Sequence, residues 1–367
     1  MTNVKVRFSA MFKDVTGTGE IGIEIEGNTV EGLIEALVGR FGSDFEQKVV
    51  DDDTGELRRF VNVFVNGRDI RNLSGPDTEL DDGDEVRLIP AVAGGKEEFG
   101  FSEDQIVRYS RQIVLPEVGG KGQRKLLDSN ALVVGAGALG SPAILYLAGA
   151  GVGKIGIVDD DEVDLSNLQR QVIHGSDDVG KPKVDSAKET INRINPELEV
   201  KTYEKRLEPE NVFEIIRGWD MVIDGSDNFP TKFLVNDSCT LEGTPFSHGG
   251  ILRFMGMCTT VLPGEGPCYR CFAPEAPPEG AVPSCQEAGV LGSIPGIIGS
   301  IQASEAIKYL LGLNGLLTGR MLYLDASEMK FDEFEFKRNP DCPSCGDDPE
   351  ITDLSKVDYG HVCEVSF

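Results

Sequence analysis

The chain has 367 residues, of which 40% are hydrophobic and 26% are charged, and this predicts a globular protein of two or three domains with ordinary cores. The formal net charge of −27 disfavours binding to nucleic acid or to anionic membranes, because their phosphates would be repelled. A signal peptide is not recognisable, and apolar stretches such as residues 144–152 are too short to span a bilayer, so we expect a cytoplasmic protein without membrane or nucleic-acid partners.

Residues 1–95 have the pattern of a small, self-contained domain. Apolar and polar residues alternate in two strands near the start, and the apolar spacing becomes helical after Thr29, the expected N-cap. Asn66-Gly67 is a strong hairpin signal after a third strand. The elements are predicted at residues 4–10, 21–25, 29–37, 60–65 and 85–90, in the order ββαββ. This order and the length predict an α+β β-grasp fold, similar to ubiquitin.

Two glycines, Gly94 and Gly95, lie where this domain should end. A di-glycine tail is thin enough to place its carboxylate in an enzyme's cleft, because glycine has no side chain to clash. Here a peptide bond to Lys96 takes the place of that carboxylate. The sequence thus indicates a substrate fused to its enzyme, with a carrier domain at 1–95, a linker at 96–102 and an enzyme domain at 103–367.

The longer domain alternates strands and helices. Buried parallel strands are predicted at residues 131–134, 155–159 and 221–224, and one more helix at 103–112. This alternation predicts an α/β Rossmann-like fold with a central, mostly parallel sheet.

A glycine-rich turn follows the first of these strands. Gly135, Gly137 and Gly140 have the spacing that brings phosphates against backbone N–H groups at a helix N-terminus. Asp159, at the end of the next strand, can accept hydrogen bonds from both hydroxyls of a ribose. On these residues alone, a nicotinamide or flavin dehydrogenase is as good an interpretation as another nucleotide enzyme.

Polar and cationic side chains beyond Asp159 favour a triphosphate. They are Asn167, Arg170, Lys181 and Lys183. A triphosphate that is cleaved needs Arg and Lys to stabilise the leaving pyrophosphate, whereas a dinucleotide is held mainly by backbone amides. Asp227, at a strand end, can hold Mg²⁺ through one carboxylate. Singly, the lysines could be solvated and Asp227 could cap a helix, but together these residues favour a site for ATP and Mg²⁺.

Four of the eight cysteines form two C-x-x-C pairs, Cys268 with Cys271 and Cys342 with Cys345. Four thiolates without an open position predict a closed, tetrahedral zinc site with a structural role. We expect Cys239, Cys258 and Cys363 to pack as small hydrophobic side chains. His174, His248 and His361 lack triad or metal spacing, which favours structural roles.

Several of these motifs together resemble the MoeB/ThiF/HesA family, the relatives of ubiquitin-activating enzymes. The resemblance is carried by residues 108–116, the glycine-rich turn, 164–171 and 224–228, and covers about 104–363. It implies an ATP-dependent adenylyltransferase that activates the C-terminal glycine of a sulfur-carrier protein as an acyl-adenylate, with Mg²⁺ and a structural Zn²⁺.

The same resemblance implies roles for particular residues. Asp159 would bind the ribose, and Asn167, Arg170 and Lys183 the phosphates. Arg111 would reach into the site of a partner subunit, which implies a homodimer. The full nucleotide-binding set is Gly135, Gly137, Ala138, Gly140, Asp159, Asp161, Ser166, Asn167, Arg170, Lys183, Asp227 and Asn228. A carboxylate that attacks the α-phosphorus needs no general base, because it is already ionised at pH 7.

Cys285 is a further candidate for a catalytic residue. It ends a Pro-rich loop at 273–284 and precedes a Gly-rich helical segment. As in some relatives, it could accept the activated glycyl group as a thioester or acyl-disulfide. Alternatively, it could assist without covalent chemistry.

Residues 1–95 resemble the MoaD/ThiS sulfur carriers, and the stretch 55–60 is nearer to the carrier CysO. Carriers of this family need a free terminal glycine, so either a protease cuts after Gly95, or the domain is a tethered mimic and the substrate binds in trans. No rhodanese-like stretch follows Cys345, so we expect a separate sulfur donor such as a cysteine desulfurase or rhodanese. The pathway stays open among molybdopterin, thiamine, cysteine and tRNA thiolation.

Two other functions are considered. One is a non-catalytic scaffold with a vestigial nucleotide site and a tethered carrier mimic. The other, more distant, is an NAD-dependent oxidoreductase.

Overall fold

A computed structural model describes residues 1–8, 11–51, 54–58, 61–90, 100–277 and 288–360. It divides into two compact units, Met1–Lys121 and Gly122–Phe367, which are described separately. The division falls within helix α6 (Gly119–Asp128), so helix α5 (Glu103–Ile113) is grouped with the first unit. Residues 91–99 lie outside the described part, and the domain boundaries expected at 95 and 102 stay a prediction.

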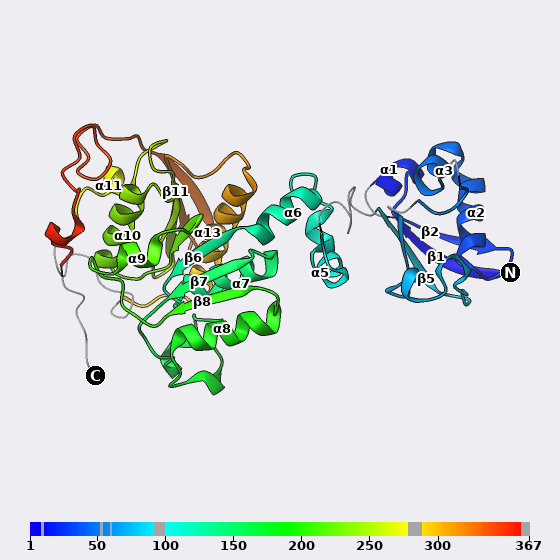
Figure 1. Ribbon diagram of the computed structural model, residues 1–367, viewed down its shortest axis with the longest axis horizontal. Helices are drawn as coiled ribbons and strands as arrows, with labels where there is room; N and C mark the ends of the chain where they lie inside the picture. Colours follow the sequence, from blue (N-terminus) through cyan, green and yellow to red (C-terminus); the bar gives the residue numbers. More distant parts are fainter. Residues whose placement is uncertain (9–10, 52–53, 59–60, 91–99, 278–287, 361–367) are drawn as a thin grey trace. The chain divides into compact units, whose positions relative to one another are not determined.

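The first unit is built on a five-stranded sheet in the order β2-β1-β5-β3-β4. Figure 1 labels β1, β2 and β5 of this sheet. The central strands β1 and β5 are parallel, and the other neighbours are antiparallel. The strands are β1 (Thr2–Phe8), β2 (Glu20–Ile25), β3 (Val61–Val65), β4 (Arg68–Asp69) and β5 (Glu85–Pro90). The helices are α1 (Met11–Thr16), α2 (Val30–Phe41) and α3 (Ser43–Val49), with 3₁₀ turns at Ile70–Asn72 and Gly75–Asp77. The predicted β-grasp fold is confirmed.

Local sequence signals determine several of these elements. Thr29 caps α2 as predicted, since its side chain accepts a hydrogen bond from the Gly32 N–H at 3.3 Å. Asn66 and Gly67 both have positive φ, as the tight turn between β3 and β4 requires. Helices α1 and α3 were not predicted; α3 contributes the fully buried Phe45 to the core beneath the sheet.

The second unit is built on an eight-stranded sheet in the order β13-β12-β11-β10-β9-β6-β7-β8. Neighbouring strands from β8 to β10 are parallel, and those from β10 to β13 are antiparallel. The parallel half agrees with the Rossmann-like sheet that the sequence predicted. The strands are β6 (Asn130–Val134), β7 (Lys154–Val158), β8 (Glu199–Tyr203), β9 (Met221–Asp224), β10 (Phe246–Leu252), β11 (Met255–Val261), β12 (Arg320–Asp325) and β13 (Lys330–Glu335). The helices are α7 (Gly140–Ala150), α8 (Lys183–Ile194), α9 (Val212–Ile216), α10 (Phe229–Glu242), α11 (Tyr269–Phe272) and α13 (Ser293–Leu311), with 3₁₀ turns at Leu165–Asn167, Ser176–Asp178 and Leu354–Lys356.

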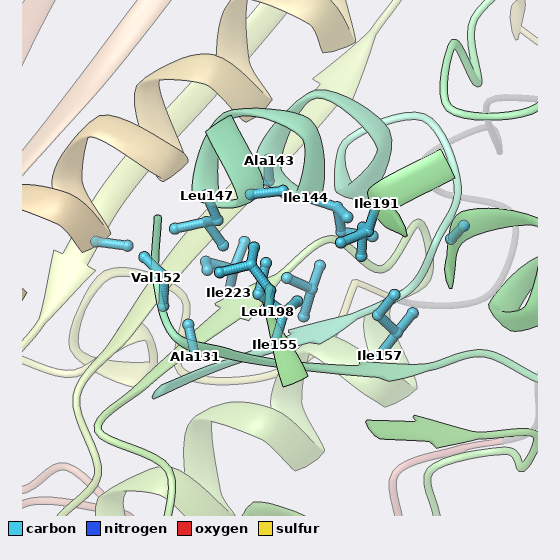
Figure 2. Close-up of a cluster of buried hydrophobic side chains, with 14 of the residues drawn as sticks. Ala131, Ala143, Ile144, Leu147, Val152, Ile155, Ile157, Ile191, Leu198 and Ile223 are labelled. Atoms are coloured by element: carbon cyan, nitrogen blue, oxygen red, sulfur yellow. The ribbon is translucent and has the colours of Figure 1, made fainter. Parts of the chain in front are cut away.

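Hydrophobic cores lie on both faces of this sheet, one against the helices α9 and α10 and the other against α7 and α8. Figure 2 shows Ile144 and Leu147 of α7 and Ile191 of α8 facing Ile155 and Ile223 of the strands. Each buried aliphatic side chain of this size contributes about 1.5–3 kcal/mol relative to exposure. The strands that follow β6 in the sequence are added on one side of it as β7 and β8 and on its other side as β9, so the strand order switches sides at β6. Ligands of open α/β sheets bind at the carboxyl ends of the strands at such a point.

Among the helices in the described part of the chain, none is long and apolar enough to cross a bilayer.

Gly156, in β7, provides a test of how tightly side chains pack against the sheet of the second unit. A Cβ at Gly156 would lie 2.5 Å from the Trp219 ring and 2.8 Å from Leu132, whereas a Cβ at Gly149 would meet nothing within 4 Å. We predict that Gly156→Ala lowers the free energy of unfolding by about 1–3 kcal/mol through overpacking. Gly149→Ala, in helix α7, is the matched control and should not lower it. Trp219, the one tryptophan in the sequence, reports unfolding of this unit by fluorescence in urea. Equal stabilities for the two variants would contradict the prediction.

Candidate functional site

The glycine-rich turn between β6 and α7 is packed as closely as backbone allows. Gly135 has φ +89°, and a Cβ there would lie 3.0 Å from the Gly225 carbonyl oxygen. A Cβ at Gly140 would lie only 1.8 Å from the Gly135 oxygen. Only glycine therefore fits at both positions, and the first N–H groups of α7 are left at the carboxyl edge of the sheet.

Asp159 follows β7, and its carboxylate is hydrogen-bonded to this turn. One carboxylate oxygen accepts the Ala136 N–H at 2.7 Å, and the other accepts the Asp161 N–H at 2.9 Å. Each oxygen keeps a second lone pair, so the carboxylate can still accept hydrogen bonds from a ligand. Burial raises the pKa of Asp159 above its ordinary value, and the Lys183 ammonium opposes that rise.

Lys183, the first residue of α8, is brought to the same place. Its side chain is only 6% exposed, and its Nζ lies 2.6 Å from an oxygen of Asp161, which is exposed. An ammonium has three donors, so Lys183 retains donors for an anionic ligand. Lys181 differs, because its side chain is more exposed and its ammonium lies 3.0 Å from the buried Asp178 and 3.1 Å from the exposed Glu189.

The segment at 164–171 forms a 3₁₀ turn held by its own polar groups. Asp164 accepts the Ser166 N–H at 2.8 Å, and the Asn167 amide oxygen accepts the Asp164 N–H at 3.2 Å. Arg170 donates to the Ser166 carbonyl at 3.0 Å. The amide nitrogen of Asn167 and the remaining N–H groups of Arg170 are the donors that this turn can offer to phosphate.

Asp227 lies at the carboxyl end of β9, beside the glycine-rich turn, and is exposed. The cap of α10 is Asn228, whose side-chain oxygen accepts the Thr231 N–H at 2.9 Å. The alternative that Asp227 caps this helix is therefore wrong. An exposed carboxylate at this edge can bind a divalent cation.

The four cysteines of the two C-x-x-C pairs form one cluster. Their sulfur atoms all lie within 4.8 Å of one another, with 3.6 Å between Cys268 and Cys342 and 3.4 Å between Cys271 and Cys345. Tetrahedral zinc with Zn–S bonds of about 2.3 Å requires sulfur separations of about 3.8 Å, so the cluster fits this ion. Asn339 donates its N–H to the Cys271 sulfur at 3.4 Å.

The cluster is anchored to helix α10 by buried polar groups. Arg270, inside the first pair, makes two hydrogen bonds of 2.7 Å to the fully buried Asp237. The neighbouring Asn236 accepts the Tyr269 N–H at 2.8 Å. A two-point ion pair of this kind fixes orientation as well as distance.

Comparison with known proteins gives the family. Residues 109–344 match the ThiF family, and residues 6–95 match the ThiS family. The chain belongs to the ThiF family. The resemblance stated from the sequence is thus confirmed for both parts.

Two relatives of this ThiF-family chain are similar to it along nearly their whole length. It is 50% identical to the SAMP-activating enzyme E1 of Haloferax volcanii over 71% of this chain and 96% of that protein. It is 47% identical to the sulfur carrier protein adenylyltransferase of Thermus thermophilus over 72% of this chain and 98% of that protein. The crystal structure of MccB from E. coli with ATP has a TM-score of 0.57 at 22% identity, over 65% of this chain and 74% of that one, and shares the fold.

Some residues named from the sequence have no described position. Gly94, Gly95, Cys285, Cys363 and His361 lie outside the described residues. Arg111 is exposed on α5, in the first unit, and Cys239 and Cys258 are fully buried as predicted.

The sequence did not predict a buried polar network behind the site. Asp224, Lys232, His248 and Gln302 are all less than 9% exposed and bond to one another or to neighbouring carbonyls. The four residues are spread over 224–302 of the sequence, and no spacing motif joins them.

His174 gives a pH-dependent test of the glycine-rich turn. Its Nε2 lies 2.9 Å from the Ala136 carbonyl, which can only accept, so Nε2 carries the proton and Nδ1 accepts from Ser186 at 2.8 Å. Burial lowers the pKa of His174 below its ordinary 6.5. The unfolded chain therefore binds the proton first, and stability due to this residue is lost as pH falls below about 6.5.

We predict that His174→Gln lowers the free energy of unfolding by about 1–3 kcal/mol at pH 7.5, because the two hydrogen bonds are weakened. Between pH 7.5 and 5.5 the variant should lose less stability than the wild type, because Gln cannot titrate. Asp178, next to His174, has its pKa lowered to about 2 and stays ionised across this window. Urea unfolding followed by Trp219 fluorescence measures both, and parallel pH profiles would contradict the prediction.

Proposed function

We propose that this chain is an ATP-dependent adenylyltransferase that activates the C-terminal glycine of a ubiquitin-like sulfur carrier protein. The observation that carries this proposal is the identity of 47–50% with two relatives named for carrier activation, along nearly their whole length. Asp159 is hydrogen-bonded to the glycine-rich turn, Lys183 lies near Asp159, and Asp227 follows Gly225, which packs against the turn; this arrangement supports the proposal. A dehydrogenase gains no support from the family, and a scaffold is left as the second candidate.

We infer the following roles at the nucleotide. The turn from Gly135 to Gly140, with Ala138, offers backbone N–H groups to the phosphates, and Asp159 accepts the ribose hydroxyls. Ser166 and Asn167 lie beside the phosphates, where Arg170 and Lys183 neutralise charge. Asp161 keeps the Lys183 ammonium in place, as its 2.6 Å contact suggests. Asp227, with Asn228 beside it, would hold Mg²⁺, which would supply positive charge to neutralise the phosphates.

These residues suit the attack of a carboxylate on the α-phosphorus. An oxygen of the carrier's terminal carboxylate forms a bond to that phosphorus, and the bond to the β-phosphate oxygen breaks. The products are an acyl-adenylate and pyrophosphate. The nucleophile is already ionised, so positioning and charge neutralisation supply the rate enhancement. Later sulfur transfer would give a thiocarboxylate.

The carrier is either the chain's own ThiS-like part, released by cleavage after Gly95, or a separate protein. Intact-mass measurement of the purified chain distinguishes these: a fragment ending at Gly95 indicates a processed precursor, and a stable full-length mass indicates a substrate in trans. The pathway, the sulfur donor (a cysteine desulfurase or rhodanese), the cytoplasmic location and the covalent role of Cys285 stay predictions.

ATP–pyrophosphate exchange with a carrier ending in Gly-Gly tests the function. We predict exchange by the wild type and a loss of about 100-fold in Lys183→Ala, because one cation that stabilises the transition state is removed. Lys181→Ala is the matched control, since Lys181 pairs with Asp178 and Glu189 rather than with Asp161, and it should keep activity within about twofold. No exchange by the wild type would leave the scaffold as the function. Equal losses in both lysine variants would contradict the role of Lys183.

An apolar groove in the second unit supports the predicted homodimer. Tyr146 of α7, Ile297 and Ile301 of α13 and Phe331 of β13 line a shallow groove of about 920 Å³. Tyr146 is 59% exposed and Phe331 49%. Contiguous exposed apolar surface marks an interaction site, and we infer that a second copy of this chain covers it.

Mixing of inactive variants tests whether Arg111 acts across this dimer. Arg111→Ala and Lys183→Ala should each abolish most exchange activity. After subunit exchange, an equimolar mixture should recover about one quarter of wild-type activity, because half of the dimers contain one site with both residues. A mixture as inactive as its components would place Arg111 in its own subunit's site.

We infer that the cysteine cluster holds one structural Zn²⁺. Cys342→Ser should reduce bound zinc from one per chain to none and lower the thermal midpoint, because three thiolates no longer close the tetrahedral site. Cys258→Ser changes a buried cysteine outside the cluster and should keep the zinc. Elemental analysis after gel filtration measures this, and full zinc content in Cys342→Ser would contradict the proposal.

A further inference from the structure

The loop from Gly225 to Asn228 carries Asp227, and the carboxylate of Asp224 shapes this loop. Asp224 ends β9 and is fully buried. One of its oxygens accepts both the N–H of Ser226, at 3.1 Å, and its hydroxyl, at 2.5 Å. The loop also donates the Gly225 N–H to the Val134 carbonyl at 2.9 Å. The hydrogen bonds to the Asp224 carboxylate and to the Val134 carbonyl therefore fix the path of the backbone that leads to Asp227.

A buried charge of this kind persists only if it is compensated. The second oxygen of Asp224 lies 3.3 Å from the Lys232 ammonium and 2.8 Å from Nδ1 of His248. Although burial opposes ionisation, Lys232 and His248 hold the pKa of Asp224 far below its usual value. Burial lowers the pKa of His248, so its neutral ring donates from Nδ1 to the carboxylate. Lys232 also donates to the Gly249 carbonyl and so ties α10 to β10.

The same network continues toward the cysteine cluster. The His248 ring stacks on the Tyr269 ring, with 3.9 Å between centroids and 28° between planes. Tyr269 directly follows Cys268, and its N–H is held by Asn236. An unbroken series of contacts thus leads from the cluster through Tyr269, His248 and Asp224 to the loop that carries Asp227.

We propose that Asp224, Lys232 and His248 are positioning residues for Asp227, and that Tyr269 links them to the cysteine cluster, so that the packing of the cluster determines how well Asp227 binds Mg²⁺ with ATP. This inference rests on the proposed nucleotide site. The polar groups that face His248 in this network are the Asp224 carboxylate and the Lys232 ammonium, on β9 and α10 respectively. No group in the network needs to contact ATP itself.

Equilibrium binding of ATP to the full-length chain, titrated with Mg²⁺, tests the inference without turnover. In His248→Leu, the Mg²⁺ concentration that gives half of the gain in ATP affinity should rise about tenfold, because a hydrogen bond to a charged acceptor is lost. Tyr269→Leu should shift it in the same direction. Affinity for ATP without Mg²⁺ and zinc content should stay at wild-type values.

Two variants serve as matched controls. His248→Asn places an amide N–H near the position of Nδ1 and should restore the wild-type Mg²⁺ dependence. Phe334→Leu makes the same aromatic-to-Leu change on β13, but Phe334 is 53% exposed and packs on Tyr323, outside the network, so it should cause no shift.

An unchanged Mg²⁺ dependence in His248→Leu would overturn the inference, even if the thermal midpoint falls, because a purely structural role predicts that result. A shift in His248→Leu without one in Tyr269→Leu would overturn the link to the cluster. If His248→Leu does not fold, a wild-type Mg²⁺ dependence in Tyr269→Leu overturns the inference and a raised one supports it. Absence of pyrophosphate exchange in the wild type would refute the adenylyltransferase function alone, since ATP and Mg²⁺ binding is measured separately.

Discussion

The second unit depends on the contact between two backbone loops at the carboxyl edge of its sheet. A Cβ on Gly225 would lie 3.0 Å from both the Gly140 N and the Val134 O, and one on Gly135 would lie 3.0 Å from the Gly225 O. Side chains cannot enter this contact, so the turn after β6 and the loop after β9 hold each other rigidly. That rigidity places the N–H groups of α7, the carboxylate of Asp159 and the exposed Asp227 at one edge. Enzymes that act on phosphoryl groups depend on preorganisation of this kind, because they accelerate the reaction mainly by positioning the reactants and stabilising charge.

The negative net charge of the chain repels a polyphosphate, but the distance of most of these charges from the site makes the repulsion weak. Charges farther apart than about 8 Å are largely screened at physiological salt, so the net −27 acts weakly on a ligand at the site. The local field comes from Lys183, whose side chain is 6% exposed and therefore little screened, and from Arg170. Asp161 partly neutralises Lys183 before ligand binds, which lowers the cost of keeping an ammonium nearly buried.

The sequence predicted those parts whose cause is local. Thr29, the Asn66-Gly67 turn and the glycine spacing after β6 act over a few residues, and the two C-x-x-C pairs require each other chemically. The sequence could not predict the network of Asp224, Lys232, His248 and Gln302, because its members lie on four different elements and meet only through the sheet order. It also allowed Asp227 as a helix cap, whereas the cap of α10 is Asn228. Pairings across long sequence separations have no signature in spacing.

Helix α13 explains why the antiparallel half of the sheet belongs to the nucleotide site. Its Gln302 donates to the Asp224 carbonyl at 2.8 Å and to the Ser247 carbonyl at 3.1 Å, at the parallel pair β9 and β10. One turn earlier, a Cβ on Gly299 would lie 2.3 Å from the Leu139 oxygen, at the entrance of α7. Helix α13 thus contacts the chain next to both the turn after β6 and the loop after β9. Because α13 also packs on β11 through Ile298, at Gly256, the strands that carry no ligand residue stabilise the position of those that do. The Rossmann half alone would lack this support, and the site is a property of the whole eight-stranded unit.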